Sequence, residues 1–277
     1  MATPLYRRIV DDVRQQIQAR VLAPDAKLPS EQELQRRYRM SRNTVRQAMD
    51  VLGRLGLVEK RPGKGTFVTG RPTPFITTLS ADPESGLGGG EGQAYREAVS
   101  ARGGTPVAGD PQVEVQQARE TVARALGLAA GAQVVSRHQL RYVDRQPHSM
   151  QTTFYPMSLV DQGADRLLSS ATIWPGTVDY LANRLSIRQA GYRDTIMARV
   201  PDPNETAFFR LPADGSISVL ETNRTAYGQD GVPYRFTVSV FPAHRHRLVI
   251  STHQVPPADE AVLTMPVESD PPGGSHA

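Results

Sequence analysis

The stretch MSRNTVRQAMDVLGRLGLVEKRPGKGTFV, residues 40–68, joins a helix pattern to a short hairpin pattern. Ser41 is placed to cap the helix N-terminus, and Gly56 is typical of the residue that follows a helix C-terminus. Between them, apolar residues recur at helical spacing, namely Val45, Ala48, Met49, Leu52 and Leu55. The segment therefore predicts an amphipathic helix with one face in a core, followed by two short strands.

Polar residues suited to a nucleic acid occupy the other face of this helix, in its first turn and a half. Arg42 and Arg46 lie one turn apart, and either guanidinium can donate two hydrogen bonds to guanine in the major groove. Asn43 suits adenine, while Ser41, Thr44 and the helix N-terminus suit phosphate oxygens. This pattern predicts a helix that packs on one side and reads DNA on the other.

A basic turn connects the two short strands. The runs LVEK and GTFV flank Arg61-Pro62-Gly63-Lys64, which predicts a hairpin with a positively charged tip. Glycines at Gly63 and Gly65 allow the backbone to approach a partner closely. We expect this hairpin, with Lys64 at its tip, to lie against the minor groove next to the helix.

Two further helices are predicted upstream. The first has an apolar face formed by Leu5, Ile9, Val13 and Ile17. The second begins after Ser30, which forms a capping box with Glu33, and it turns Leu34 and Tyr38 inward. Helix, capped helix, turn, exposed helix and hairpin is the order of elements in a winged helix-turn-helix.

Charge is distributed unevenly along the chain. Residues 1–75 contain 15 Lys and Arg against 7 Asp and Glu, a balance of +8, whereas the other 202 residues hold 17 and 21, a balance of −4. A basic head on a mildly acidic body is typical of a protein with one polyanion-binding domain. A solvated basic surface is the alternative that charge alone leaves open.

The N-terminal segment resembles the winged helix-turn-helix of GntR-type bacterial transcription regulators. The resemblance rests on LPSEQEL, then SRNTVRQAMDVLGRLGLVEKRPGKGTFV, in order and at the family's spacing. It implies DNA contacts from Arg42, Asn43, Thr44 and Arg46 and from the hairpin around Gly63, Lys64 and Gly65. The family often has arginine where this chain has Gln32, which could still bond adenine or a phosphate.

The remaining chain is predicted to form a second, α+β domain. We expect residues 1–70 to be the DNA-binding domain, 71–92 a Pro/Gly-rich flexible linker, 93–257 a mixed domain and 258–277 a disordered tail. Two antiparallel hairpins are predicted, from 134–143 with 148–155 and from 217–227 with 232–242, a further strand over 247–255, and helices over 177–185 and 204–211. Segregated helices beside antiparallel strands indicate a sheet-centred module.

This second segment resembles the UTRA domain of the HutC subgroup, which has a chorismate-lyase-like fold. The resemblance rests on LRYVDRQP, TFYP, the short helix after PGT, and RTAYGQDGVPYRF. It implies a pocket for a small-molecule effector of unknown identity and dimerisation through the same domain. The matching effector positions are Gln139, Arg141, Gly176, Thr177, Arg235 and Phe241. Since several of these depart from the subgroup's pattern, we expect a less sugar-like pocket that tolerates anions through Arg141 and Arg235.

Several function classes remain as alternatives. The leading interpretation is a homodimeric repressor that binds a palindromic operator in double-stranded DNA and is modulated by an effector. Two alternatives remain. One is a constitutive repressor whose second domain only dimerises, and the other is an enzyme with a chorismate-lyase-like module. His244 and His246 form an H-x-H pair without a third ligand at metal spacing, Asp144 and Asp230 lie in expected turns, and Trp174 is expected in packing or pocket lining.

The composition limits the cellular compartment and the kinds of site that we expect for this protein. The chain has no cysteine, so disulfides and thiolate metal sites are excluded. No apolar run reaches the ~18 residues needed to span a bilayer. We therefore expect a bacterial, cytoplasmic protein that is not an enzyme, without cofactor, metal or membrane contact.

Overall fold

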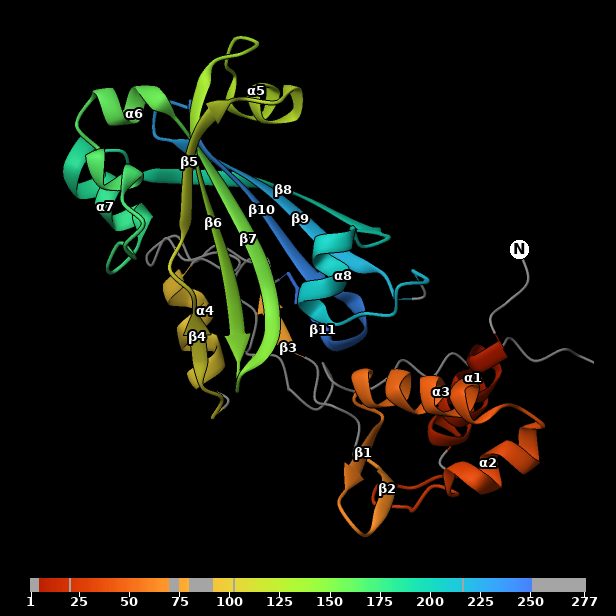
Figure 1. Ribbon diagram of the computed structural model, residues 1–277. Coiled ribbons are helices and arrows are strands. Elements are labelled where there is room, and N and C mark those ends of the chain that lie inside the picture. Colours follow the sequence, from red (N-terminus) through yellow and green to blue (C-terminus); the bar gives the residue numbers. More distant parts are fainter. Residues whose placement is uncertain are drawn as a thin grey trace, which may run out of the picture.

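The computed structural model describes residues 5–19, 21–69, 75–79, 92–101, 103–215 and 217–250. Two parts are visible in Figure 1, a small helical head, residues 5–69, and a larger sheet domain, residues 92–250. The head contains α1 (Leu5–Gln18), α2 (Glu31–Tyr38), α3 (Arg42–Arg54), β1 (Val58–Arg61) and β2 (Gly65–Val68). This is the predicted order of a winged helix-turn-helix.

The head core is built from the apolar faces of its three helices. Ile9 of α1, Leu34 of α2 and Leu52 of α3 are fully buried together with other members of the predicted stripes. Leu5 is an exception, because it is 68% exposed while its neighbour Tyr6 is buried. The buried face of α1 therefore starts one residue later than predicted, with Tyr6, Ile9, Val10 and Val13 at helical spacing.

The sheet domain is organised around seven antiparallel strands in the order β4-β6-β7-β10-β9-β8, with β5 also paired to β6. The strands are β4 (Pro106–Ala108), β5 (Gln112–Gln117), β6 (Gln133–Val143), β7 (Gln146–Pro156), β8 (Gln189–Arg199), β9 (Val219–Gly228) and β10 (Pro233–Pro242). The helices are α4 (Gly92–Ser100), α5 (Glu120–Leu126), α6 (Met157–Asp161), α7 (Thr177–Leu185), α8 (Pro203–Phe209), and the 3-10 turns η1 (Asp165–Leu168) and η2 (Ala243–Arg245). The predicted α+β class with an antiparallel sheet is confirmed.

Both predicted hairpins are present and lie side by side in the sheet. β6 pairs with β7 through a turn at Asp144 and Arg145, and β9 pairs with β10. β7 and β10 then join the two hairpins, with Phe236 opposite Phe154. α5 and α8 pack on one face of this sheet, whereas α6, η1 and α7 pack on the other (Figure 1).

A strand lies inside the range predicted as a flexible linker. β3 (Phe75–Thr78) pairs in parallel with β11 (His246–Val249), and the carbonyl oxygen of Leu79 accepts hydrogen bonds from Tyr192 and Arg224. The linker prediction over 71–92 was therefore wrong for these residues, because buried Ile76 and Leu79 anchor them to the sheet domain. The rest of 71–92, apart from residue 92, and the predicted tail lie outside the described residues.

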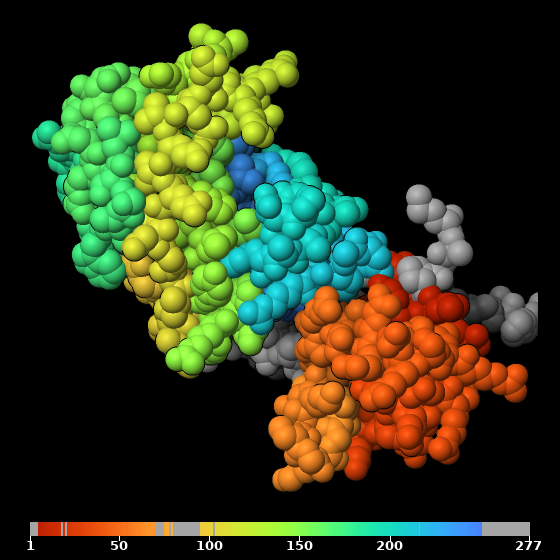
Figure 2. Space-filling view, viewed as in Figure 1, coloured from red at the N-terminus to blue at the C-terminus, as the bar shows by residue number. Residues whose placement is uncertain are grey.

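The head contacts the sheet domain through its α1 and α3 side. One hydrophobic cluster continues from the head core to Phe209, Leu211 and Ile217 beside α8, and Arg7 Nε lies 3.4 Å from Asp214 Oδ2. Figure 2 shows this contact, where the residues around 210 meet the head. No helix in the described ranges is long and apolar enough to cross a membrane.

Candidate nucleic-acid interface and ligand pocket

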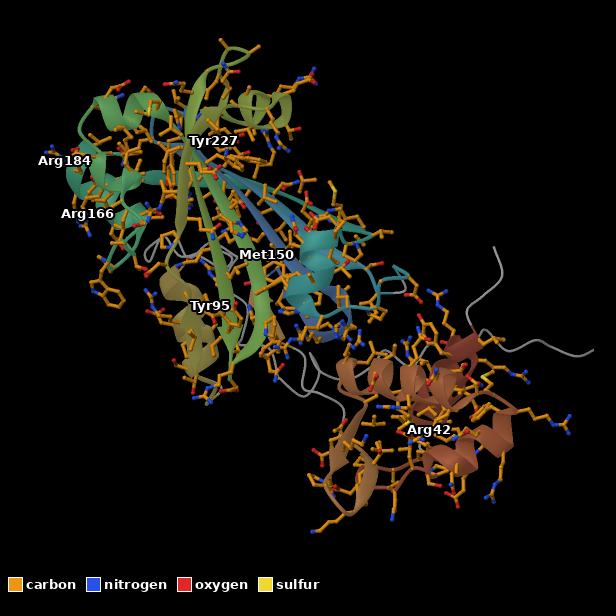
Figure 3. The ribbon with its side chains drawn as sticks, viewed as in Figure 1. Arg42, Tyr95, Met150, Arg166, Arg184 and Tyr227 are labelled. Carbon is orange, nitrogen blue, oxygen red and sulfur yellow. The ribbon has the colours of Figure 1, made fainter. Side chains whose placement is uncertain are left out.

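The N-terminus of α3 is capped by Ser41 and exposed to solvent. Ser41 Oγ accepts a hydrogen bond from the Thr44 backbone N–H at 3.2 Å, and the two hydroxyl oxygens lie 2.9 Å apart. Arg42, Asn43 and Arg46 are exposed, while Val45 between them is fully buried. Figure 3 places Arg42 on the head, away from the sheet. The cap therefore fixes the helix start, and the predicted reading residues project from it.

Both ends of α2, the helix that precedes α3, are defined by local structure. Ser30 and Glu33 form the predicted capping box at the start of α2, with the Ser30 N–H donating to Glu33 at 2.7 Å. These hydrogen bonds hold the pKa of the Glu33 carboxyl below its usual value. α2 ends at Tyr38, and its C-cap Arg39 adopts the left-handed conformation, with φ of 53°. Gln32 is exposed in the first turn of α2, so its side chain is accessible to a partner.

The hairpin of β1 and β2 forms a wing with a cationic tip. Gly63 has φ of +72° and Gly65 of +117°, a region that favours glycine. A Cβ on Gly65 would also lie 2.8 Å from Cε of Lys27. Lys64 is exposed between them, whereas Arg61 is paired with Asp25 and Glu59 and stacked on Phe67. Lys64 is thus accessible to a partner, while Arg61 supports the wing.

One side of α3 also faces the sheet domain. Arg46 lines a cleft of about 420 Å³ between the two parts, together with carboxylates and further cations: Glu31, Asp50, Arg54, Lys60, Arg210 and Arg245. The placement of the sheet domain against α3 therefore influences the access of a partner to Arg46.

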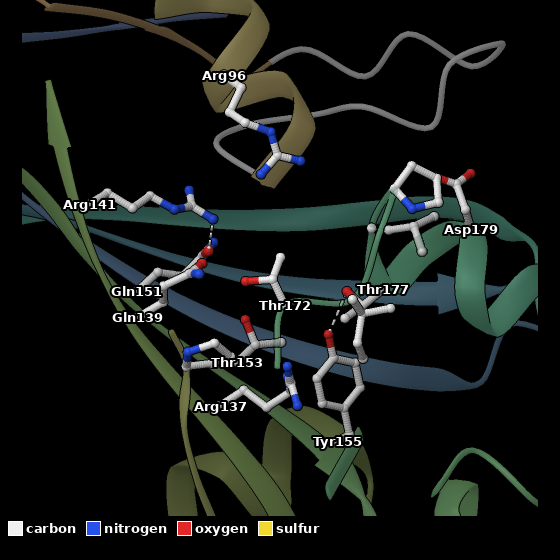
Figure 4. A pocket seen from close by; sticks show the side chains of 15 residues that line it. Arg96, Arg137, Gln139, Arg141, Gln151, Thr153, Tyr155, Thr172, Thr177 and Asp179 are labelled. Atoms are coloured by element: carbon white, nitrogen blue, oxygen red, sulfur yellow. Dashed lines mark hydrogen bonds between the residues drawn. The ribbon is translucent and has the colours of Figure 1, made fainter. Parts of the chain in front are cut away.

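A second candidate site is a cavity of about 80 Å³ on the α7 side of the sheet (Figure 4). Four of the six predicted effector residues line it, namely Gln139, Arg141, Gly176 and Thr177. Sequence reasoning missed other lining residues, which include Arg96, Arg137, Gln151, Thr153, Tyr155, Thr172 and Asp179. Arg137 could have been found, because it alternates with Gln139 and Arg141 on one face of β6.

Hydrogen bonds fix most of the polar groups in this cavity. Arg137 donates to the carbonyl oxygens of Leu167, Ser169 and Ala171 at 2.5–3.0 Å, and burial lowers its pKa. Arg141 donates to Gln151 Oε1, and its guanidinium lies 5.1 Å from the Tyr95 ring centroid. Arg137 therefore shapes the loop over the cavity, while Arg141 is presented to the cavity by its neighbours.

The N-terminus of α7 opens at the same cavity. Gly176 is its N-cap and supplies no side-chain hydrogen bond. Thr177 Oγ1 accepts a hydrogen bond from the Tyr155 hydroxyl at 2.8 Å. The first backbone N–H groups of a helix have no partner within the helix and carry partial positive charge. Together with Arg96 and Arg141, this end of the cavity suits an anion, with Asp179 as the opposing charge.

The other two predicted effector residues lie elsewhere. Arg235 is 1% exposed and donates to Gln189 Oε1 at 2.8 Å, outside the lining of the cavity. Phe241 is buried in an aromatic cluster that the structure shows at His148, His246, Phe75 and Tyr95. Arg235 and Phe241 therefore lie in the interior of the sheet domain and do not line this cavity.

The aromatic cluster connects the cavity to β3. Tyr95, stacked under Arg141, lies 5.2 Å from the His148 ring, and His148 lies 4.9 Å from Phe75, the first residue of β3 (centroid distances). His246 lies 4.7 Å from His148, and its Nδ1–H donates a hydrogen bond to the carbonyl oxygen of Pro242 at 3.0 Å. Within the described ranges, no three His, Asp or Glu side chains are grouped to hold a metal.

The stability of the fold is expected to decrease as the pH decreases, because His148 is buried and neutral. Burial, with Arg141 and Arg245 nearby, lowers the pKa of His148 from 6.5 to about 3. Below about pH 6.5 His148 binds a proton in the unfolded chain but stays neutral in the folded chain. Protonation therefore favours the unfolded chain, and the free energy of unfolding decreases progressively between about pH 6.5 and pH 3. One such histidine contributes a slope of about 1.4 kcal/mol per pH unit.

Urea unfolding of wild type and His148→Phe at about pH 7, 6 and 5 measures this slope. The variant is expected to lose less stability on acidification, by about one proton's worth of slope. Parallel pH dependences in the two proteins would show that His148 is not the responsible group.

Comparison with known proteins gives two family matches. Residues 5–68 match the family described as "Bacterial regulatory proteins, gntR family", and residues 101–247 match the UTRA domain, which covers more than half of the chain. The HTH-type transcriptional regulator GgaR of Escherichia coli is 27% identical over 237 residues, covering 86% of each chain. The HTH-type transcriptional repressor NagR of Bacillus subtilis is 24% identical over 246 residues, covering 89% of this chain and 93% of NagR.

Solved structures agree with these matches. PhnF from Mycobacterium smegmatis aligns with a TM-score of 0.53 at 25% identity, covering 87% of this chain and 99% of PhnF. A chain described as a GntR-family transcriptional regulator aligns with a TM-score of 0.56 at 21% identity, covering 91% of this chain and 99% of that chain. The arrangement of a winged head before an antiparallel sheet domain is therefore shared over nearly the full length.

Proposed function

Because the chain belongs to the GntR family of bacterial regulatory proteins and carries a UTRA domain after its DNA-binding head, we propose that it is an effector-controlled repressor. In this proposal a homodimer binds a palindromic operator, and a small anionic molecule in the cavity changes that binding. That the chain is a DNA-binding transcriptional regulator, rather than an enzyme, follows from the family itself.

The observation that carries the DNA-binding part is the exposed N-terminal face of α3. Arg42, Asn43 and Arg46 project from a capped helix start, and a helix of this size fits the major groove. The wing adds Lys64 beside them for the phosphate backbone. Repression is supported by the relative NagR, whose name describes a transcriptional repressor.

Homodimeric binding is proposed because a single head reads too few bases to select one site. Two heads related by a two-fold axis would contact half-sites about one helical turn apart. DNase footprinting of the DNA upstream of the protein's own gene tests this proposal. We expect a protected region with two-fold sequence symmetry, and a short asymmetric footprint would contradict the dimeric arrangement.

Control by an effector is supported by the route from the cavity to the head. The contacts run from Arg141 through Tyr95 and His148 to Phe75, which opens the strand that follows the head. An effector changes DNA affinity only if it binds one placement of the head better than another. The cleft at Arg46, which is lined by residues of both the head and the sheet domain, supports an effect of that placement on the reading face.

A further inference from the structure

A cation and an exposed aromatic ring meet at the edge of the cavity. Arg96 of α4 lines the cavity, and its guanidinium carbon lies 4.7 Å from the ring centroid of Trp174. Trp174 is the single tryptophan of the chain and is 67% exposed. Its neighbours Ile173 and Pro175 both line the cavity. An exposed tryptophan beside a polar cavity is more typical of a binding site than of a fold-stabilising contact.

Arg96 differs from the other two arginines of the cavity in how it is held. Arg137 donates to four carbonyl oxygens between Arg166 and Ala171, and Arg141 donates to Gln151. In the part of the chain that the structure describes, Arg96 forms no ion pair and donates no hydrogen bond, and the Trp174 face is its contact. Figure 4 shows Arg96 entering from α4, on the side of the cavity away from Gln139 and Gln151.

A guanidinium stacked on an aromatic face keeps its N–H groups available in the plane of the stack. An oxyanion in the cavity offers Arg96 two parallel charge-assisted hydrogen bonds, which are stronger than an exposed contact with a ring. The ring would then shield these bonds from water on one side. The geometry therefore allows Arg96 to bind an anion without leaving Trp174.

We propose that Arg96 and Trp174 form a clasp, made of these two side chains, that binds the oxyanion of the effector, a phosphate or carboxylate group, between α4 and the N-terminus of α7. This inference rests on the proposed role of the cavity as the effector site. It assigns to Arg96 the specificity for a negatively charged ligand and to Trp174 the support of that arginine. The small cavity restricts the ligand to a compact molecule.

The test uses the full-length protein with inorganic phosphate and with malonate as probes, at ionic strength held constant with sodium chloride. Calorimetry gives the affinity, and tryptophan emission reports on Trp174 alone, because no second tryptophan is present. We expect both anions or one of them to bind wild type and to change its emission. Arg96→Gln is expected to weaken binding about tenfold or more, and at saturating anion its emission change is lost.

Two variants separate the possible results. Arg119→Gln, an exposed arginine outside the cavity, is expected to behave as wild type. Arg141→Gln is expected to lose anion binding. Binding that depends on Arg141 but not on Arg96, or an unchanged emission response in Arg96→Gln, would overturn the clasp and leave the effector site standing. Absence of binding of either anion to wild type would overturn both the clasp and the anionic effector.

Discussion

Replacing Arg42 or Arg46 with alanine is expected to weaken binding to the operator by about 1–3 kcal/mol, provided that arginine is bidentate to guanine. Both side chains are exposed at the start of α3, on the face opposite Val45 and Leu52, so neither substitution touches the head core. The loss is expected for the operator and not for unrelated DNA, because base contacts carry the sequence discrimination. Fluorescence anisotropy with both DNAs measures the difference.

The matched variants are Lys64→Ala and Arg124→Ala. Replacement of Lys64 at the wing tip is expected to weaken binding to both DNAs by similar factors, since a phosphate contact carries no sequence information. Arg124 is exposed on α5 of the sheet domain, paired with Glu120, and its replacement is expected to leave both affinities unchanged. If Lys64→Ala changed the discrimination while the α3 variants weakened all DNA equally, the reading element would be the wing and not α3.

The second large effect is expected in the sheet domain, where Asp194→Ala should destabilise the fold by about 3–5 kcal/mol. Asp194 forms two hydrogen bonds with Arg224, at 2.7 and 2.6 Å, and both side chains are largely buried. Removal of the carboxylate leaves the Arg224 guanidinium buried under Tyr192 without its counter-charge. Urea denaturation followed by circular dichroism gives the change in unfolding free energy.

Asp161→Ala provides the control, because Asp161 is exposed at the end of α6 and substitutions at such positions usually change stability by less than about 0.5 kcal/mol. Arg224 also donates to the carbonyl of Leu79, at the end of the strand that follows the head. Asp194→Ala is therefore expected to loosen this anchor as well. A loss of stability below about 1 kcal/mol would mean that the pair is replaced by water without cost.

The head could be predicted almost completely from sequence because its signals are local. The caps at Ser30 and Ser41, the apolar stripe of α3 and the glycines of the wing each act within a few residues. The two hairpins were also visible, since alternation and turn residues mark them. β3 was missed because its partner β11 lies about 170 residues away and its parallel pairing leaves no local pattern.

From the sequence, residues that line the cavity could be identified only where they share one strand or stand at the start of one helix. Gln139 and Arg141 on β6, with Gly176 and Thr177 before α7, were identified and are brought together. Arg96 was missed because nothing in its local sequence indicates that α4 packs beside β6. Arg235 was assigned to the pocket by resemblance alone, and it bonds to Gln189 outside the cavity lining, because a matched strand position does not fix which side chains reach a cavity.

Selection of one DNA sequence by the head is tested most directly by fluorescence anisotropy across a salt series. The probes are the DNA upstream of the protein's own gene and an unrelated duplex of equal length. We predict that the upstream DNA binds at least ~10³-fold tighter at physiological salt. Equal affinities that weaken together as salt rises would contradict the prediction for this site, because they would show binding to the phosphate backbone alone.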